Sequence, residues 1–295
     1  MTTIPLHTTA APSRTSPARF HPGRAAATAI MVIGACYCLL PVAWLVIAAT
    51  KSQSQLFSTS TLRPGSGLSE NLHNLFAYDG GAYGRWVVNT LLYAFGGAAL
   101  STAVSCMAGY ALARFDFRGR ETAFRVLLAG VLVPGVSLAV PQYFLVAKAG
   151  FANTYWAVLL PSIISPFGIY LCKVYASASV SKELLEAARV DGAGQTRTFR
   201  SIVVPVMLPG LVTVFLLQFI GIWNNFLLPY LMLSDSKKFP LTLGLFTMIS
   251  QGSGEPTLYT ALLVGAAMSV IPLIAMILFL QRFWRMDLIS GGLKG

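Results

Sequence analysis

Charged residues are scarce in this sequence. Only 11% of its 295 residues are Asp, Glu, Lys or Arg, whereas 55% are hydrophobic. An ordinary soluble domain carries about 25% charged residues. The composition therefore argues against a water-soluble fold and favours a chain that lies in lipid.

Residues that hold metals, disulfides or nucleotides are also few. No G-x-x-x-x-G-K-[ST] phosphate loop occurs, so we expect no ATP, and no other cofactor or metal, to be bound by this chain. The histidines and cysteines lack the spacing of a zinc site or a disulfide framework. They are His7, His21, His73, Cys36, Cys38, Cys106 and Cys172. The sequence predicts a protein that is not an enzyme.

Charged residues are also unevenly placed along the chain. They leave six uncharged runs, at 25–50, 86–113, 126–147, 149–172, 201–234 and 256–281. A membrane-spanning helix needs roughly 20 such residues. The pattern predicts an all-α, polytopic membrane protein with six transmembrane helices. Prolines within the runs, such as Pro134 and Pro209, are expected to kink or break these helices.

The distribution of basic residues predicts the orientation in the membrane. If the N-terminus is cytoplasmic, the inner segments hold 15 of the 21 Lys and Arg residues. This is the positive-inside pattern, with both termini in the cytoplasm of a cell (inner) membrane protein. The net charge of +11 then reflects topology, and no nucleic-acid partner is expected. Residues 1–24, rich in Pro, Thr, Ser and Arg, are predicted to be a disordered cytoplasmic tail before the membrane domain 25–295.

Small residues cluster in the second run. They would allow close contact between helices in lipid. They are Gly96, Gly97, Ala98, Ala99, Ser101, Ser105, Ala108 and Gly109.

The cytoplasmic segment between the fourth and fifth runs has the pattern of a complete short helix. Ser181 can cap its N-terminus, and Gly192 can supply the left-handed residue that ends it. Glu183 and Arg189 suit the two ends of the helix dipole. Leu184, Leu185 and Ala188 form an apolar patch, which predicts contact with a partner or with the membrane surface.

This loop, residues 181–205, resembles the EAA signature of the permeases of ABC importers. The matching residues of the loop are Glu186, Ala187, Ala188, Asp191, Gly192, Ala193, Phe199, Ile202 and Pro205, and Pro209, just after it, matches the extended form of the signature. The resemblance implies that 25–295 is a six-span permease domain. It also implies that the helix between spans four and five is a coupling helix, whose residues Glu186 to Ala188 and Asp191 to Ala193 dock in a cleft of a separate ATPase.

Two further segments are similar to the maltose-type, carbohydrate-uptake branch, and to its second permease subunit. One is Trp223-Asn224-Asn225, placed in the outer half of span five, and the other is the C-terminal stretch containing Gly291, Gly292 and Lys294. The resemblance implies that this C-terminal stretch contacts the ATPase. The asparagines could contact substrate in the pathway or form hydrogen bonds between helices.

The resemblance also implies a set of partners. These are a second, homologous permease, two ATPase subunits that bind ATP and Mg²⁺, an extracellular solute-binding protein, a sugar and membrane lipid.

Other functions remain open at this point. Importers of amino acids, peptides or phosphonates carry a similar loop. A secondary transporter would be expected to hold carboxylates or histidines within its spans for ion coupling, and none occurs in the six runs. An intramembrane enzyme would need a catalytic cluster, which the runs also lack.

Overall fold

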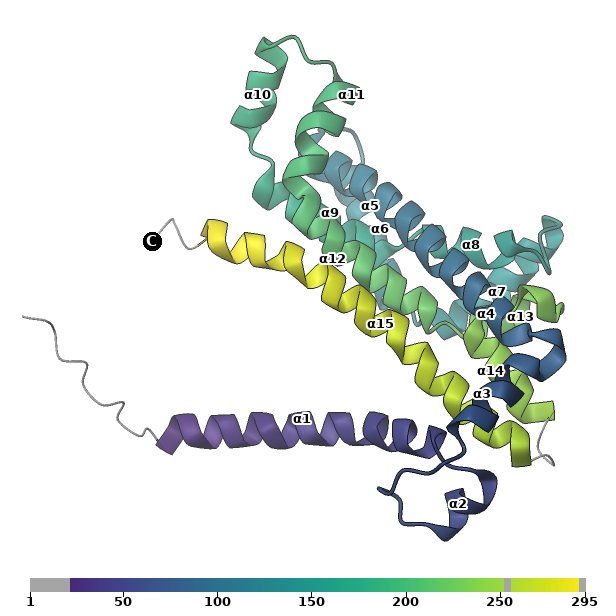
Figure 1. The fold of residues 1–295 in the computed structure, drawn as a ribbon. Coiled ribbons are helices and arrows are strands. Elements are labelled where there is room, and N and C mark those ends of the chain that lie inside the picture. The colour runs from purple at the N-terminus through teal and green to yellow at the C-terminus, as the bar shows by residue number, and fades with distance from the viewer. Residues whose placement is uncertain (1–21, 252–255, 292–295) are drawn as a thin grey trace, which may run out of the picture. The chain divides into compact units, whose positions relative to one another are not determined.

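The computed structural model describes residues 22–251 and 256–291, and its regular elements there are all helices (Figure 1). The chain divides into two units, residues 1–44 and 45–295. The first unit contains most of α1 (Pro22–Ala49), of which Ala26–Ala49 is long and apolar enough to cross a membrane. Of the predicted tail, residues 1–21 lie outside the described part of the chain, and 22–24 belong to α1.

The second unit holds the remaining candidate spans. Four of them are long and apolar enough to cross a membrane without a sharp bend: Ala82–Arg114, Tyr155–Ser179, Gln195–Trp223 and Thr257–Gln281. They are built from α4 (Ala82–Leu91), a π-helical turn η2 (Leu92–Gly96), α5 (Gly97–Arg114), α8 (Tyr155–Ile163), α9 (Pro166–Ser179), α11 (Gln195–Thr198), a second π-helical turn η3 (Phe199–Val203), α12 (Val204–Trp223) and α15 (Pro256–Gly291). The prediction of an all-α, polytopic membrane protein is confirmed.

The predicted span 126–147 is broken in the middle. α6 (Arg120–Leu132) and α7 (Gly135–Lys148) meet at an angle of 106°. Val133 and Pro134 between them are extended, with ψ of 122° and 127°. Proline has no N–H to continue a helix, and it disfavours helical geometry in the residue before it. The break expected at Pro134 therefore occurs, and counting the bent pair as one span gives six.

The predicted run 201–234 also ends early as a helix. α12 stops at Trp223, and a short helix α13 (Leu227–Met232) follows after a break. Next come a 3-10 turn η4 (Ser236–Lys238) and an apolar helix α14 (Leu241–Gln251), which the charge pattern did not predict because it is too short for a span.

The segment expected to be the long outer loop is also partly helical. It contains α2 (Gln53–Ser58), α3 (Leu68–Ala77) and the 3-10 turn η1 (Tyr78–Gly80). The buried Asn71 amide ties α3 to the end of α1, because it donates hydrogen bonds to the carbonyl oxygens of Ala49 and Lys51 at 3.0 and 2.8 Å.

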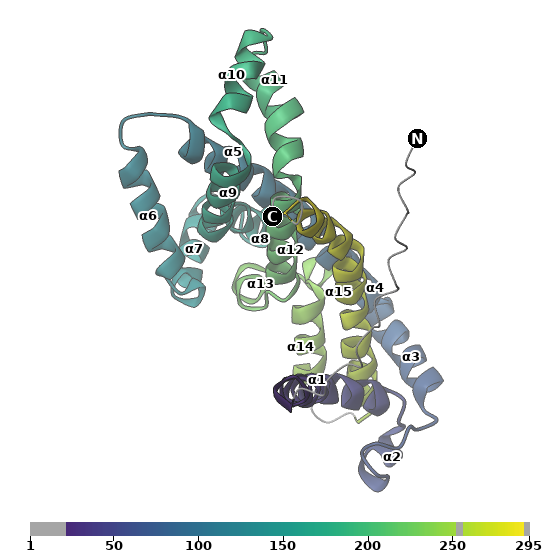
Figure 2. The ribbon, with the colours of Figure 1, turned by 90° about the vertical axis from the view of Figure 1, so that its left-hand side faces the viewer.

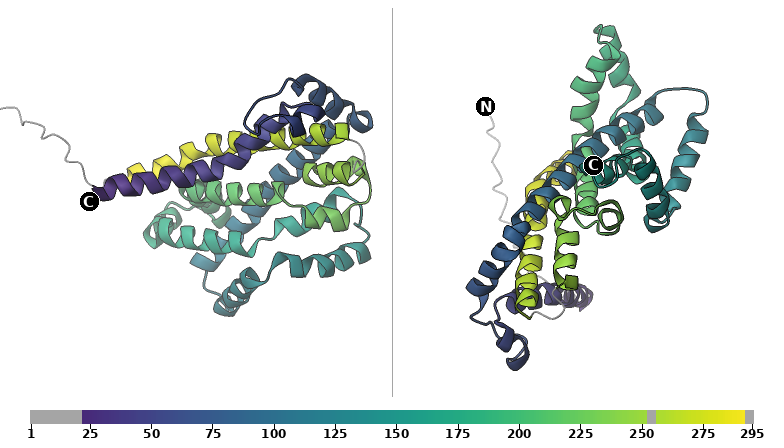
Figure 3. Two further views of the ribbon diagram at one scale, coloured as in Figure 1. Left: turned by 90° about the horizontal axis from the view of Figure 1, so that it is seen from below. Right: turned by 90° about the vertical axis from the view of Figure 1, so that its right-hand side faces the viewer.

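The centre of the second unit is a packed group of three helices, α5, α9 and α12 (Figures 1 and 2). α6 and α15 lie on opposite sides of this group (Figures 2 and 3). Small residues make its closest contact possible: a Cβ atom added at Gly109 of α5 would lie 2.5 Å from the Cβ of Cys172 on α9. The close approach predicted from the small residues is therefore present.

Candidate functional site

The candidate coupling helix is α10 (Lys182–Val190), which projects with α11 beyond the ends of α5 and α9 (Figure 1). The Ser181 hydroxyl accepts a hydrogen bond from the Leu184 N–H at 3.2 Å, as expected of an N-cap. Hydrogen bonds from its own backbone N–H and from the Ser181 side chain hold the pKa of Glu183 below its usual value. Both predicted features of the helix start are present.

The C-terminus of α10 is closed by a Schellman motif. Gly192 has φ +73°, its N–H bonds to the Arg189 carbonyl at 3.0 Å, and the Ala193 N–H bonds to the Ala188 carbonyl at 2.9 Å. These bonds fix the direction in which the chain leaves the helix. The predicted role of Gly192 as the left-handed stop is confirmed.

The exposed surface of α10 differs from the predicted one. Ala188 is buried, and Leu185 packs against the cluster of buried residues that includes Cys172 and Val203. The patch predicted to meet a partner therefore faces the permease itself in large part. Its spacing on one face of the helix suited either role, and the packing of Leu185 against this cluster decided between them.

The opposite side of α10 is left free. Glu186, Ala187 and Val190 are exposed, and Val190 is 87% exposed. Asp191 is also exposed, and Ala193 is half-buried. Sequence reasoning missed Val190, although its position four residues after Glu186 places both on one helical face. We name Glu186, Ala187 and Val190 the outer face of α10.

Glu186 also borders a cavity of about 370 Å³ between α10 and the start of α6. Four cationic side chains line it: Arg114, Arg120, Lys182 and Arg189. Among the described residues Glu186 forms no ion pair within 4.0 Å, whereas Arg120 pairs with Asp116 at 2.7 Å. The Glu186 carboxylate is therefore available to a partner.

The structure separates the three residues predicted for the substrate pathway. Trp223 is the last residue of α12; it is buried and stacks on Phe219 at 5.6 Å between ring centroids. Asn224 is exposed, and its amide donates back to the Ile220 carbonyl at 2.9 Å. Asn225 accepts a hydrogen bond from the Leu228 N–H at 3.3 Å. The motif thus lies at the break after α12 and not along a straight span.

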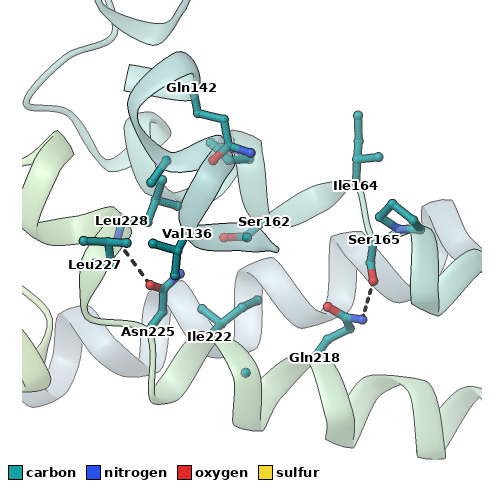
Figure 4. A pocket seen from close by; sticks show the side chains of 15 residues that line it. Val136, Gln142, Ser162, Ile164, Ser165, Gln218, Ile222, Asn225, Leu227 and Leu228 are labelled. Atoms are coloured by element: carbon teal, nitrogen blue, oxygen red, sulfur yellow. Dashed lines mark hydrogen bonds between the residues drawn. The ribbon is translucent and has the colours of Figure 1, made fainter. Parts of the chain in front are cut away.

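Of these three residues, Asn225 lines a cavity in the described part of the chain. The cavity has a volume of about 370 Å³ and lies between α7, the α8–α9 junction and α12 (Figure 4). Gln142, Ser162, Ser165 and Gln218 also border it. Sequence reasoning missed the two glutamines. Their position within uncharged runs could have marked them, because polar groups in a span are costly unless they face protein or water.

The residues predicted to form the C-terminal contact lie at the end of the described part of the chain. Gly291 is the last residue of α15, and Gly292 and Lys294 lie outside the described residues.

Comparisons with known proteins define the class of protein. Residues 102–285 match the model of the binding-protein-dependent transport system inner membrane component family, and the chain belongs to that family. It is a multi-pass membrane protein that serves as the permease component of such a transport system.

Individual relatives match over nearly the whole chain. The arabinooligosaccharide transport permease of Halalkalibacterium halodurans is 33% identical over 260 residues, which cover 87% of this chain and 91% of the relative. The lactose transport permease of Rhizobium radiobacter is 31% identical over 253 residues, 86% of this chain and 90% of the relative. A chain of the solved bacterial ABC transporter that imports the acidic polysaccharide alginate has the same fold, with a TM-score of 0.78 at 21% identity over 90% of this chain and 99% of that one.

Proposed function

We propose that this permease belongs to an ATP-driven importer of sugars and that α10 couples it to a separate ATPase. The observation that carries the proposal is the geometry of α10: a capped helix with a fixed exit, whose free side presents an unpaired carboxylate. The names of the relatives, which refer to arabinooligosaccharides and lactose, support a sugar as the cargo. Uptake of a panel of sugars, amino acids and peptides distinguishes this cargo from the alternatives.

The proposed partners follow from the family to which the chain belongs. ATP and Mg²⁺ would be held by two ATPase subunits, a second homologous permease would complete the pathway, and an extracellular binding protein would deliver the sugar. Closure of the ATPase dimer would move two docked coupling helices together. α10 would transmit this motion to α12 through α11 and η3, which follow it directly in the chain. The permease would then alternate between two conformations, and the ATPase would shift the equilibrium between them.

The proposal includes an orientation, which gives a testable prediction. Fusions of a reporter that is active only in the cytoplasm, placed after Arg118, Ser181 and Gly295, should be active, because the basic residues concentrate on that side. Fusions after Ser66 and Ser236 should be inactive. Activity at Ser66 together with inactivity at Ser181 would place α10 outside the cell and rule out its contact with an ATPase.

The C-terminal stretch is proposed to touch the ATPase subunits. α15 continues ten residues beyond the apolar segment Thr257–Gln281, to Gly291. We expect deletion of residues 290–295 to change ATPase activity or its retention by the permease, while membrane insertion is unaffected. Purified complexes with and without the deletion provide the measurement, and identical retention and hydrolysis would contradict the contact.

A further inference from the structure

The cavity bordered by Asn225 is lined by uncharged groups. Each of its 15 lining residues is apolar, a hydroxyl or an amide, and no Asp, Glu, Lys, Arg or His is among them. Four of the elements that form it, α7, α8, α9 and α12, lie within candidate membrane spans. We call it the amide pocket.

The amides of this pocket carry unused hydrogen-bonding capacity. Gln218 donates through Nε2 to the Ser165 hydroxyl at 2.7 Å, and its carbonyl oxygen points away from that bond (Figure 4). Within the described residues that oxygen and the Gln142 amide have no protein hydrogen bond, and Asn225 uses its oxygen toward Leu228. Unpaired amides of this kind are expensive in lipid unless water or a ligand meets them.

Amide groups and hydroxyl groups are matched in their chemistry. An amide offers a donor and an acceptor, and each sugar hydroxyl can both donate and accept. Ile222, Val136 and Leu228 beside the amides provide apolar surface for the less polar face of a sugar ring (Figure 4). The volume of about 370 Å³ is within the roughly 300–1,000 Å³ of small-molecule pockets.

The lack of charge selects between classes of carbohydrate. A carboxylate or phosphate brought into a low-dielectric site must be paired with a cation, because its desolvation is otherwise costly. The amide pocket offers no cation. Family membership leaves the question open, since some relatives are named for neutral sugars, others for the anion sn-glycerol-3-phosphate, and the solved neighbour for an acidic polysaccharide.

We propose that the amide pocket is a sugar subsite contributed by this permease, with Gln142, Gln218 and Asn225 as its polar contacts, and that it takes neutral carbohydrate in preference to acidic carbohydrate. The inference rests on the proposed sugar transport and adds to it the residues and the charge class. The adjacent Asn224 lies outside the pocket and takes no part.

Substitutions in the assembled transporter test the amides. The complete complex, reconstituted in proteoliposomes with its binding protein, is assayed for transport of arabinotriose and trigalacturonate, which have the same number of sugar units but differ in charge. Gln142→Leu and Gln218→Leu should each lower the maximal rate for arabinotriose by roughly 2- to 10-fold, the loss of one neutral hydrogen bond. Asn224→Leu, the matched control, should transport as the wild type does.

The outcomes separate this inference from the proposed coupling. The glutamine variants should keep ATPase co-purification and the ATP hydrolysis stimulated by the binding protein, so that less sugar moves for each ATP. Wild-type transport in both glutamine variants would overturn the subsite. Loss of ATPase retention in parallel with transport would also overturn it, because the amides would then hold helices together. Neither result would bear on α10.

A labelling experiment tests occupancy directly. Ser162→Cys lies in the pocket and Asn224→Cys outside it, both in a chain with Cys36 and Cys38 replaced by serine; Cys106 and Cys172 are buried. Arabinotriose should slow the reaction of Cys at 162 with a small thiol reagent several-fold and leave Cys at 224 unchanged. Equal protection at 162 by trigalacturonate, or no protection by arabinotriose, would contradict the proposal.

Discussion

Glu186→Ala is expected to abolish most sugar uptake while the permease still inserts in the membrane. Glu186 is exposed on α10 and has no ion-pair partner among the described residues, so the substitution removes nothing that holds the chain together. In the assembled transporter its carboxylate would meet a cationic or donor group of the ATPase. Breaking a partly desolvated contact of that kind costs about 2 to 5 kcal/mol. That is enough to weaken docking roughly tenfold or more.

Gly192→Val should have the same result through a different cause. Gly192 adopts φ +73°, which a β-branched residue resists, and the Schellman bonds at Arg189 and Ala188 would be lost with that conformation. An added Cβ would meet nothing within 4 Å, so the effect comes from the backbone alone. Gly192→Asn is the matched control, because asparagine tolerates the left-handed region and should retain most uptake.

Sugar uptake, measured together with co-purification of the ATPase, tests whether α10 is the coupling element. Glu186→Gln, which keeps a hydrogen-bonding group, should lie between the wild type and Glu186→Ala. Val190→Asp should reduce retention as well, since Val190 shares the outer face of α10. If Glu186→Ala and Gly192→Val both keep normal uptake and normal ATPase retention, this loop is not the coupling element.

Gly109→Ala is expected to destabilise the permease itself. Its Cβ would lie 2.5 Å from the Cβ of Cys172 and 2.6 Å from the backbone nitrogen of Lys173. Neither atom belongs to the flexible end of a side chain, so α5 and α9 must move apart. Overpacking of this kind costs about 1–3 kcal/mol. Alanine is otherwise the better helix former by about 1 kcal/mol, which makes any loss a steric one.

Thermal unfolding of the purified chain in detergent measures this effect. A chain of this size loses about 2–4 °C of Tm for each kcal/mol. Gly84→Ala provides the control, because Gly84 lies in the same continuous helix, Ala82–Arg114, and a Cβ there meets nothing within 4 Å. It should leave the Tm unchanged or raise it. Equal Tm values for the two variants would mean that α5 and α9 do not depend on this close contact.

The sequence by itself determined the features that depend on local chemistry. The lengths of the uncharged runs gave the number of spans, because bilayer thickness sets a length that each helix must reach. Pro134 marked the break between α6 and α7, since proline cannot continue a helix. Ser181 and Gly192 marked both ends of α10, because capping depends on neighbouring residues alone.

Only the tertiary structure decided which side of an element meets which neighbour. Leu185 and Ala188 could have faced a partner, but Leu185 packs against a cluster that includes residues of α5, α9 and α12, and Ala188 is buried. Asn224 and Asn225 are chemically identical neighbours, yet the end of α12 turns one outward and the other into the amide pocket. Gln142 and Gln218 lie on different helices, and both border the amide pocket because of the 106° bend and the packing of α5, α9 and α12. Such placements arise from contacts between distant segments, whereas the pattern along the chain records only what lies within a turn or two.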